Sequence, residues 1–505
     1  MVRTLRSSLL VLLVVATSWT AAARADEAPK TDESWDAIFM GEDKVGYVHS
    51  ITTNEKENDR DVVHVRVETV MNIKRFGQSI EMKMEIDSFE TPDGKLLRID
   101  HRSPGQRIRG EVKDKTMHVT VETLGKQQTQ SMPWSDDVLG PGAEDRLLKK
   151  EPLKSGDKRT FRSFNPELGM RIISTSLFGE DAEEVAMLGG GKKKLQRVRV
   201  AIDDVPQLKN VKTTYWVDDA GEMLKSHTTL LVGMTTYRVS KEMAMAPASS
   251  FSTDFAVQTL VKVDKKIPMA YDAAEVVYRV RWDAGEGKDG DPKEVIPQDE
   301  RQFFTRGEDG GTLLVIRAVD PSQPSTSPEP ADLAGFRRPN NQLQSDNEKV
   351  VAAAKAAVGD ATDPWQKAVR IEKWVFQNLK EKNFSRAFDN AAVVAETLEG
   401  DCTEHGVLLA AMARAVGIPS RVATGLVYAD RLGAFGYHLW TEVYINGRWV
   451  PLDGTLGRGH ASPTHIKITD SSLDGVDGYT ATFLPVVPVL GRLKLEVVSW
   501  KHASQ

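Results

Sequence analysis

The hydrophobic pattern of this 505-residue chain changes at a proline-rich stretch after residue 320, and this change constrains the fold most. Before the stretch, apolar and polar residues alternate, as in residues 63–68, 80–86 and 198–202. Alternation with a period of two is typical of strands that bury one face. After the stretch, helix-like segments come first and strand-like segments follow. The chain therefore predicts an antiparallel β-rich N-terminal region followed by an α+β C-terminal domain.

We expect a multidomain protein, because the chain is longer than a single core usually supports. Residues 26–250 should form the β-rich domain, as a large curved sheet or a sandwich. Residues 251–320 should form a second β segment. Four prolines in a short run give residues 321–341 the composition of a stiff linker. Residues 342–505 then make up the C-terminal domain.

Residues 1–25 resemble a secretory signal peptide. Arg3 and Arg6 precede an apolar run over residues 9–15, and Ala23-Arg24-Ala25 has the small-x-small pattern of a cleavage site. The run is too short to span a bilayer. We therefore expect cleavage before Asp26 and export to the periplasm or the outside medium, without stable membrane insertion afterwards. An uncleaved anchor is the alternative.

The charge of the chain makes nucleic acid an unsuitable partner. Removal of residues 1–25 would take away three arginines and no acidic residue, so the formal net charge would move from −6 to −9. Binding to phosphates requires clustered Lys and Arg side chains, which a mildly acidic chain lacks overall. The run of three lysines at 192–194 follows three glycines, but the spacing is not that of a phosphate-binding loop.

The C-terminal domain has clear helix and strand signals. Asp363 followed by Pro364 predicts the start of one helix, and Asn390 predicts the start of another. A third helix is expected over residues 403–416, ended by Gly417. Three strands should follow, over residues 421–428, 438–445 and 448–452.

Cys402 is the only cysteine of the chain and precedes the third of these helices. In an exported protein a single cysteine cannot form an internal disulfide. The N-terminal end of a helix stabilises a thiolate through its free N–H groups and positive dipole. Cys402 is therefore a candidate nucleophile, and a small buried apolar residue is the alternative interpretation.

A hairpin turn brings two candidate partners together. Asn446-Gly447 is the preferred pair for a two-residue type I′ turn, so Ile445 should pair with Arg448. This register places Asp453 opposite Trp440 and one diagonal step from His438, at about 7–8 Å between Cα atoms. A slip of one residue would turn Asp453 to the other face. We predict that His438 acts as the base and that Asp453 orients its imidazole.

The remaining titratable groups near these motifs have other expected roles. His405 lies three residues after Cys402 and competes for the role of base, although we expect it to serve in packing. Glu404 and Glu442 are expected at the surface or in hydrogen bonds. His460 and His465 lack metal-ligand companions in the sequence, and a single cysteine offers no zinc pattern. We therefore expect neither a metal nor a cofactor.

Four sequence blocks around these residues resemble the bacterial transglutaminase-like superfamily. They are residues 400–405 (Gly-Asp-Cys-Thr-Glu-His), 413–421, 437–444 and 449–453. The resemblance covers about residues 346–456, so the β-rich region lies outside it. It implies a papain-like core with a Cys-His-Asp triad, and these roles fall on Cys402, His438 and Asp453. Gly454 is a departure, because Pro or Ala more often follows the aspartate.

The resemblance also implies acyl transfer through a thioester. The expected oxyanion donors are the Cys402 N–H and an upstream group, for which Asn383 is the candidate, while Trp440 should pack over the histidine. We expect hydrolysis of peptide or protein amides, and the alternative is a transglutaminase that crosslinks proteins. A non-catalytic binding or scaffold protein built on the β-rich region is an alternative of another class. A lipid or glycan ligand on the curved sheet also stays open, as does the oligomeric state.

Overall fold

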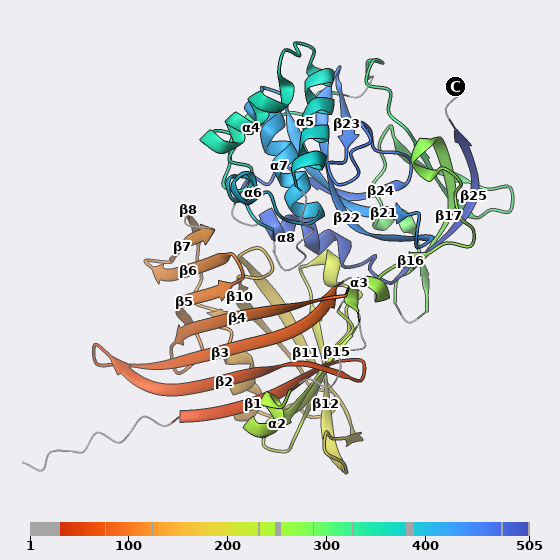
Figure 1. The fold of residues 1–505 in the computed structure, drawn as a ribbon. Coiled ribbons are helices and arrows are strands. Elements are labelled where there is room, and N and C mark those ends of the chain that lie inside the picture. The colour runs from red at the N-terminus through yellow and green to blue at the C-terminus, as the bar shows by residue number, and fades with distance from the viewer. Residues whose placement is uncertain are drawn as a thin grey trace, which may run out of the picture.

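The computed structural model describes residues 31–75, 77–123, 126–230, 233–247, 254–285, 287–325, 328–379, 388–475 and 478–502. The expected signal peptide over residues 1–25 and the oxyanion candidate Asn383 lie outside the described residues. Figure 1 shows a large sheet in the N-terminal half and a part made of helices and strands in the C-terminal half. The predicted fold class, an antiparallel β-rich region followed by an α+β core, is confirmed. Among the described residues, no helix is long and apolar enough to cross a membrane.

The N-terminal half forms one sheet of 15 strands. The order runs from β8 back to β1, where β1 pairs with β15, and then from β15 back to β9. The described neighbours are antiparallel, except that β9 and β10 run parallel. The strands are β1 Thr31–Met40, β2 Asp43–Glu57, β3 Arg60–Arg75, β4 Gln78–Glu90, β5 Leu96–Ser103, β6 Gln106–Lys113, β7 Thr116–Thr123, β8 Lys126–Pro133, β9 Val138–Leu139, β10 Lys158–Asn165, β11 Arg171–Ala186, β12 Lys192–Ile202, β13 Thr213–Val217, β14 Met223–Thr228 and β15 Met234–Val239.

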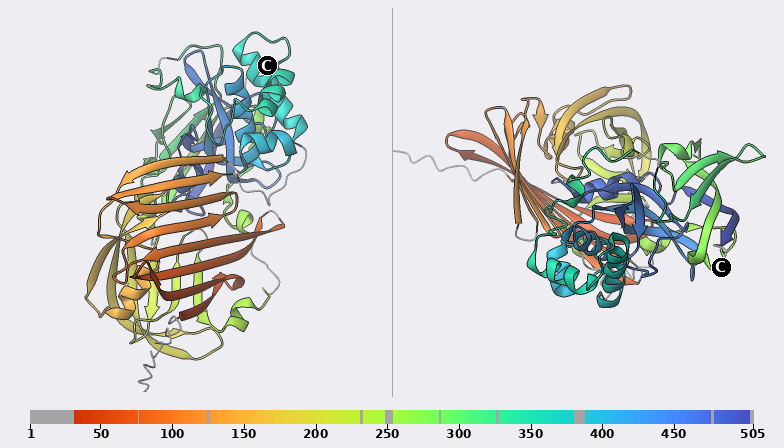
Figure 2. Two further views of the ribbon diagram at one scale, coloured as in Figure 1. Left: turned by 90° about the vertical axis from the view of Figure 1, so that its left-hand side faces the viewer. Right: turned by 90° about the horizontal axis from the view of Figure 1, so that it is seen from above.

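The sheet curls so that its two halves face each other, as Figure 2 shows. Apolar residues fill the space between them, and Ile108 of β6 packs there in one cluster with Phe164 of β10. The helix α1 (Ala143–Lys150) contributes Leu148 to a second cluster with Leu177 of β11. The inward positions of the alternating strands therefore form the core, which is the outcome that their period of two predicts.

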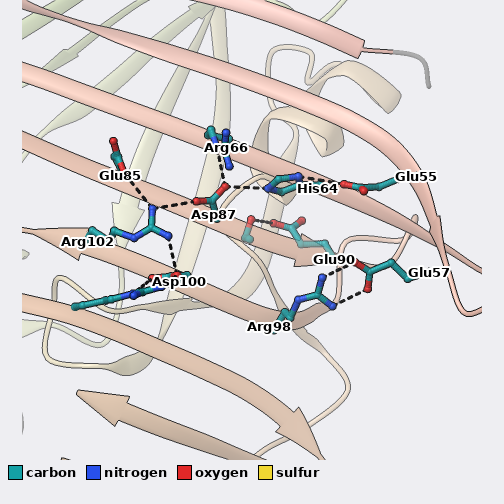
Figure 3. Close-up of polar contacts among 12 residues, drawn as sticks. Glu55, Glu57, His64, Arg66, Glu85, Asp87, Glu90, Arg98, Asp100 and Arg102 are labelled. Carbon is teal, nitrogen blue, oxygen red and sulfur yellow. Dashed lines mark hydrogen bonds and ion pairs between the residues drawn. The ribbon is translucent and has the colours of Figure 1, made fainter. Parts of the chain in front are cut away.

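The opposite face of β3 to β6 carries paired charges (Figure 3). The Asp87 carboxylate lies 2.7 Å from Arg66 Nε and 2.9 Å from His64 Nε2. On β5, Arg102 contacts Asp100 at 2.8 Å and Glu85 at 3.1 Å. Opposite charges that face each other across neighbouring strands stabilise a sheet. This face is polar, whereas the other face of the same strands is turned to the interior.

The C-terminal part, residues 261–502, is built around a five-stranded sheet with the order β16-β22-β21-β24, in which β23 also pairs with β22. Its strands are β16 Val261–Lys262, β21 Ser420–Ala429, β22 Ala434–Ile445, β23 Arg448–Leu452 and β24 His465–Ser471. Four helices pack together beside it (Figure 1), namely α4 Glu348–Val358, α5 Pro364–Asn378, α6 Ala391–Thr397 and α7 Cys402–Ala415. Helix α7 lies at the centre, and its residues from Val407 to Ala413 are fully buried.

Side-chain caps fix where these helices begin. The Asp363 carboxylate accepts a hydrogen bond from the Gln366 N–H at 2.8 Å, with Pro364 at the first helical position. The Asn390 side chain accepts from the Val393 N–H at 3.1 Å. Both predicted starts are confirmed, because each cap satisfies an N–H group that the helix leaves unpaired.

The structure differs from the expected boundary between residues 251–320 and the C-terminal domain. Strand β17 (Ala273–Asp283) pairs with β25 (Leu493–His502) in a sheet that also contains β18 Asp289–Gly290, β19 Gln302–Arg306 and β20 Thr312–Arg317. Tyr278 of β17 shares one apolar cluster with Phe435 of β22. The second β segment is therefore part of the C-terminal body, through pairings that span about 200 residues of chain.

The expected linker, residues 321–341, begins as a packed segment. The Asn446 side chain donates to the Pro321 carbonyl at 2.9 Å, and the Ser325 N–H donates to the Asn446 carbonyl at 3.3 Å. Arg448 donates to the Pro324 carbonyl at 3.2 Å. The prolines therefore lie along the β22–β23 hairpin, where a segment without its own core gains partners from the neighbouring turn.

The curved sheet and the C-terminal part are in direct contact. Leu484 of a short 3₁₀ segment (η5, Leu484–Val486) packs with Ile173 and Leu208 of the N-terminal half. Helix α8 (Gly478–Phe483) adds a hydrogen bond of 3.1 Å from Thr480 to the Glu167 carbonyl. The C-terminal end of β3 lies against the short helix α3 (Phe255–Gln258), which also contacts β22 (Figure 1).

Candidate active site

Cys402 is the first residue of α7, and the start of that helix is held by a capping box. The Asp401 side chain accepts a hydrogen bond from the Thr403 N–H at 2.8 Å, and the Glu404 side chain accepts from the Asp401 N–H at 2.9 Å. Cys402 is 8% exposed. The thiol therefore lies at the positive end of a fixed helix.

The β22–β23 hairpin has the register that its turn predicts. Ile445 pairs with Arg448 and Thr441 pairs with Leu452. Asn446 and Gly447 have φ angles of 49° and 80°, both in the left-handed region that a type I′ turn requires. Asp453 follows the last residue of β23, and its Oδ2 lies 2.8 Å from His438 Nε2. The predicted contact between the imidazole and the carboxylate is present.

His438 also contacts Cys402. Since Nε2 faces Asp453, the other ring nitrogen is left for the thiol. Burial lowers the pKa of His438, but the Asp453 charge, the hydrogen bond to Asp453 and the contact with Cys402 outweigh burial and raise this pKa to about 10. The imidazole is therefore protonated at neutral pH and can balance the charge of a thiolate.

The Asp453 carboxylate stays ionised in this buried position. Burial raises its pKa, but the His438 charge and the hydrogen bonds from His438 and His465 hold the pKa of Asp453 well below its usual range. Its other oxygen accepts from the Thr455 N–H at 2.9 Å. The carboxylate is thus held by partners on both oxygens, so the orientation of the His438 ring is fixed.

His465 is a member of the site that the sequence did not reveal. It begins β24, pairs with Val427 of β21, and places Nε2 at 2.9 Å from Asp453 Oδ2. The interpretation that His465 lacks companions is therefore wrong. Burial lowers its pKa more than Asp453 raises it, so His465 is neutral and donates to the carboxylate. Its partner strand is distant in sequence, so no local pattern could indicate this contact.

His438, Asp453 and His465 form a group whose ligand atoms lie within 4.8 Å of one another, close enough to hold a metal ion. Two imidazoles and a carboxylate are ligands that zinc accepts. Here, however, the three side chains hydrogen-bond one another through Asp453 Oδ2, and His438 also engages Cys402. This arrangement orients an imidazole towards a thiol.

Trp440 and α7 shape the surroundings of the imidazoles. The fully buried Trp440 ring lies 6.3 Å from the His438 ring at an interplanar angle of 20°, and 5.2 Å from the His465 ring at 78°. Thr441 donates to the Gly406 carbonyl at 2.8 Å and so ties β22 to α7. A Cβ atom on Gly406 would lie 2.2 Å from Leu439. Glycine at position 406 therefore leaves room for the Leu439 side chain where β22 packs on α7.

Glu372 of α5 supports the loop that carries Asp453. Its carboxylate accepts from the Gly459 N–H at 2.7 Å and from the Asp453 N–H at 3.3 Å. Burial raises the pKa of Glu372 to about 8, because the hydrogen bonds only partly offset the loss of solvent. No sequence pattern indicated this role, because Glu372 lies in an ordinary amphipathic helix.

The other predicted residues take structural positions. His405 Nδ1 lies 2.6 Å from the Asp401 carbonyl, which agrees with a packing role. Glu404 and Glu442 are both buried and hydrogen-bonded, and Glu442 lies 2.6 Å from Arg421. His460 is exposed, and its Nε2 contacts the Tyr271 carbonyl at 3.2 Å.

The N-terminal sheet contributes a cation to the site. Arg75, the last residue of β3, places Nη1 at 2.6 Å from the Asp401 carboxylate. Burial lowers the pKa of Arg75, but the charges of Asp401 and Cys402 outweigh this effect and raise it. The guanidinium therefore acts electrostatically on the start of α7. The sequence did not indicate this contact, because the two residues lie more than 300 positions apart.

Comparison with known proteins identifies the same region. A family model described as the transglutaminase-like superfamily matches residues 351–454, which include Cys402, His438 and Asp453. Residues 351–454 form a transglutaminase-like superfamily domain. The resemblance that the sequence blocks indicated is thereby confirmed for this domain. The curved sheet and strands β16 to β20 lie outside the matched residues.

One curated protein and one solved structure resemble this chain over part of its length. An uncharacterised protein of Haemophilus influenzae is 29% identical over 121 residues, which cover 19% of this chain and 33% of that protein. The chain thus matches about a third of that relative's length. A crystal structure of a candidate cysteine protease from Cytophaga hutchinsonii is 18% identical, covers 46% of this chain and 90% of that one, and has a TM-score of 0.29.

A second solved structure, a β-barrel-like protein of a domain family of unknown function from Brucella abortus, is also similar. It is 13% identical, covers 42% of this chain and 96% of that one, and has a TM-score of 0.30.

Proposed function

We propose that this protein is an exported, cysteine-dependent acyl-transfer enzyme that hydrolyses peptide or protein amide bonds through a thioester on Cys402. One observation carries the proposal. A thiol at the start of a buried helix contacts an imidazole whose pKa is raised to about 10 and whose other nitrogen lies 2.8 Å from a buried carboxylate. A nucleophile, a base and an orienting group in that order are the parts that thiol acyl transfer requires.

The first half-reaction forms the thioester. The Cys402 thiolate attacks the amide carbonyl carbon, and the carbonyl π electrons move to the oxygen. The Cys402 N–H is a donor for this oxyanion, and we propose Asn383 as the second donor. When the intermediate collapses, the C–N bond breaks and the His438 imidazolium gives its proton to the leaving amine.

The second half-reaction releases the acid. The now neutral His438 takes a proton from water, the resulting hydroxide attacks the thioester, and the thiolate leaves. Asp453 keeps the imidazole in one orientation through both steps. Trp440, packed beside both imidazoles, limits the access of bulk water to the ion pair.

The test is an activity assay on the chain without residues 1–25. A peptide library is incubated with the protein, with and without a primary amine, and the products are identified by mass spectrometry. The proposal predicts cleaved peptides that disappear with Cys402→Ala and persist in the presence of EDTA. Cleavage by the Cys402→Ala variant would contradict the thiol mechanism. Loss of activity in EDTA would instead point to a metal on His438, Asp453 and His465.

The incubation with a primary amine shows whether water or an amine accepts the acyl group. Products that incorporate the amine at glutamine side chains, without peptide cleavage, would replace hydrolysis by crosslinking. The absence of any turnover, together with a thiol that reacts only at alkaline pH, would favour a non-catalytic binding protein.

A further inference from the structure

A cavity lies where the curved sheet meets the C-terminal part. Its volume is about 250 Å³. One wall is the inner face of β4 to β8 with the turn between β10 and β11, and the other comes from the C-terminal part, including Phe388 and Leu473. The cavity is separate from the His438–Asp453 pair, because neither residue lines it.

Most of the wall is apolar and adaptable. Its apolar residues include Met82, Met84, Ile108, Met170, Phe388 and Leu473. Methionine side chains are flexible and polarisable, so they adjust to the shape of an apolar guest. The space is large enough for a short aliphatic chain.

Among the polar residues that line the cavity, His101 is buried and lacks a hydrogen-bond partner among the described residues. His101 of β5 is 2% exposed, and neither of its ring nitrogens makes a hydrogen bond to a residue that the structure describes. Glu167 Oε1 is 3.4 Å from His101 Nε2, beyond the distance of a well-formed bond. Buried polar groups nearly always have a partner, so this imidazole marks the place where a polar ligand atom belongs.

The neighbouring carboxylate sets the polarity of that ligand atom. A carboxylate only accepts, so the ring nitrogen that faces Glu167 carries the proton in the neutral imidazole. The second nitrogen, Nδ1, is then an acceptor. We propose that the cavity binds a single short aliphatic chain that bears a hydroxyl or amide N–H, and that this group donates to His101 Nδ1.

The ligand would touch a segment that leads to α7. The Asp389 N–H, next to Phe388 in the wall, donates to the Glu404 carboxylate at 3.0 Å, and Glu404 belongs to the capping box of the Cys402 helix. This proposal does not depend on the proposed enzymatic function, because the cavity and His101 exist whether or not Cys402 reacts.

The experiment measures the binding of three probes to the chain without residues 1–25 by calorimetry. The probes are 1-octanol, its methyl ether and octanoate. The alcohol can donate a hydrogen bond and the ether cannot, so we expect the alcohol to bind about tenfold more tightly. His101→Phe keeps the shape of the side chain and should remove this difference.

Two matched variants of β4 test the place of binding. Met84→Trp fills the cavity and should abolish binding of the alcohol. Lys83→Trp adds the same bulk on the opposite face, where the lysine is 50% exposed, and should leave binding unchanged. Equal affinity for alcohol and ether, tightest binding of octanoate, binding that survives Met84→Trp, or no saturable binding by the unmodified chain would each overturn the proposal.

Discussion

The interactions of the candidate site converge on the Asp453 side chain. A single oxygen accepts from two imidazoles, at 2.8 Å from His438 and 2.9 Å from His465, and the backbone N–H donates to Glu372. A buried carboxylate with this many donors has little freedom to rotate. The position of the His438 imidazole is therefore set by its contact with a fixed carboxylate.

His465 is expected to act as a positioning residue. His465→Phe keeps the bulk but leaves Asp453 with one fewer donor, and a lost hydrogen bond to a charged group costs about 1.5–3 kcal/mol. We expect kcat to fall roughly 10- to 100-fold, with a shifted pH profile and little change in KM. His465→Gln retains a donor and should recover part of the rate. An unchanged kcat and pH profile in His465→Phe would show that the contact is only structural.

The raised pKa of His438 predicts how stability depends on pH. Below the usual histidine pKa of about 6.5, the folded and unfolded chains both hold the proton, and the stabilisation is complete. Between pH 6.5 and about 10 only the folded chain keeps it. The free energy of unfolding should therefore fall across this window relative to His438→Gln. Urea titrations in a Cys402→Ser background, which removes the thiol titration, would measure it; a constant difference would contradict the shift.

The site residues that could be predicted from the sequence are those whose positions depend on local patterns, such as helix starts and turns. The start of a helix indicated Cys402 as a candidate nucleophile, and a two-residue turn predicted the register that joins His438 to Asp453. The sequence did not indicate three further residues of the site, His465, Glu372 and Arg75, for one physical reason. Each belongs to an element that contacts the site from a distant part of the sequence. Such contacts produce no periodic pattern of apolar and polar residues.

At the scale of elements, the β3–β4 hairpin links the curved sheet to the start of α7. Its Arg75 pairs with Asp401, which is only 1% exposed at the side chain. A buried carboxylate that loses its cation is costly, because solvent cannot replace the partner. The cation that pairs with Asp401 therefore comes from the hairpin, outside residues 351–454.

Arg75→Gln should lower kcat/KM by about tenfold or more, as expected when a charge-assisted contact is lost. Alkylation of Cys402 near pH 6 should slow in parallel, and Arg75→Lys should restore part of both rates. Arg66→Gln is the matched control, because Arg66 lies on the same strand and pairs with Asp87 at 2.7 Å, away from Cys402. Equal losses in both variants would assign Arg75 a general role in the sheet rather than a role at the site.

Helices and strands with a clear capping residue or a clear alternation of apolar and polar residues could be predicted from the sequence. The distant strands with which they pair could not. The alternating strands and the caps Asp363 and Asn390 all appear where the sequence places them. The boundary near residues 321–341 does not, because β17 finds its partner β25 at the far end of the chain. Proline content could not show that the start of this segment packs on the β22–β23 hairpin.

At the scale of the whole molecule, the C-terminal part is closed by its last strand. β25 pairs with β17 over most of its length, and Leu493, Leu495 and Val497 are buried in the cluster that also holds Tyr278 and Phe435. Burial of such side chains stabilises by about 1.5–3 kcal/mol each. The strand thus contributes an amount comparable to the total stability of a domain.

A chain that ends at residue 492 should therefore lose its cooperative unfolding transition and become sensitive to limited proteolysis. A chain that ends at residue 502 keeps β25 and serves as the control. Circular dichroism during heating, followed by brief protease treatment, would compare the two. A sharp transition in the shorter chain would show that β17 does not need β25.

The proposed mechanism requires that His438 keep Cys402 as a thiolate, and the rate of Cys402 alkylation by iodoacetamide at pH 6 measures this ionisation. A thiol with an ordinary pKa near 8.5 is less than about 1% ionised at this pH. We predict rapid alkylation of the unmodified chain at pH 6 and a rate at least about tenfold lower in His438→Gln, which should then rise with pH. Alkylation of both proteins only at alkaline pH, at equal rates, would contradict the account.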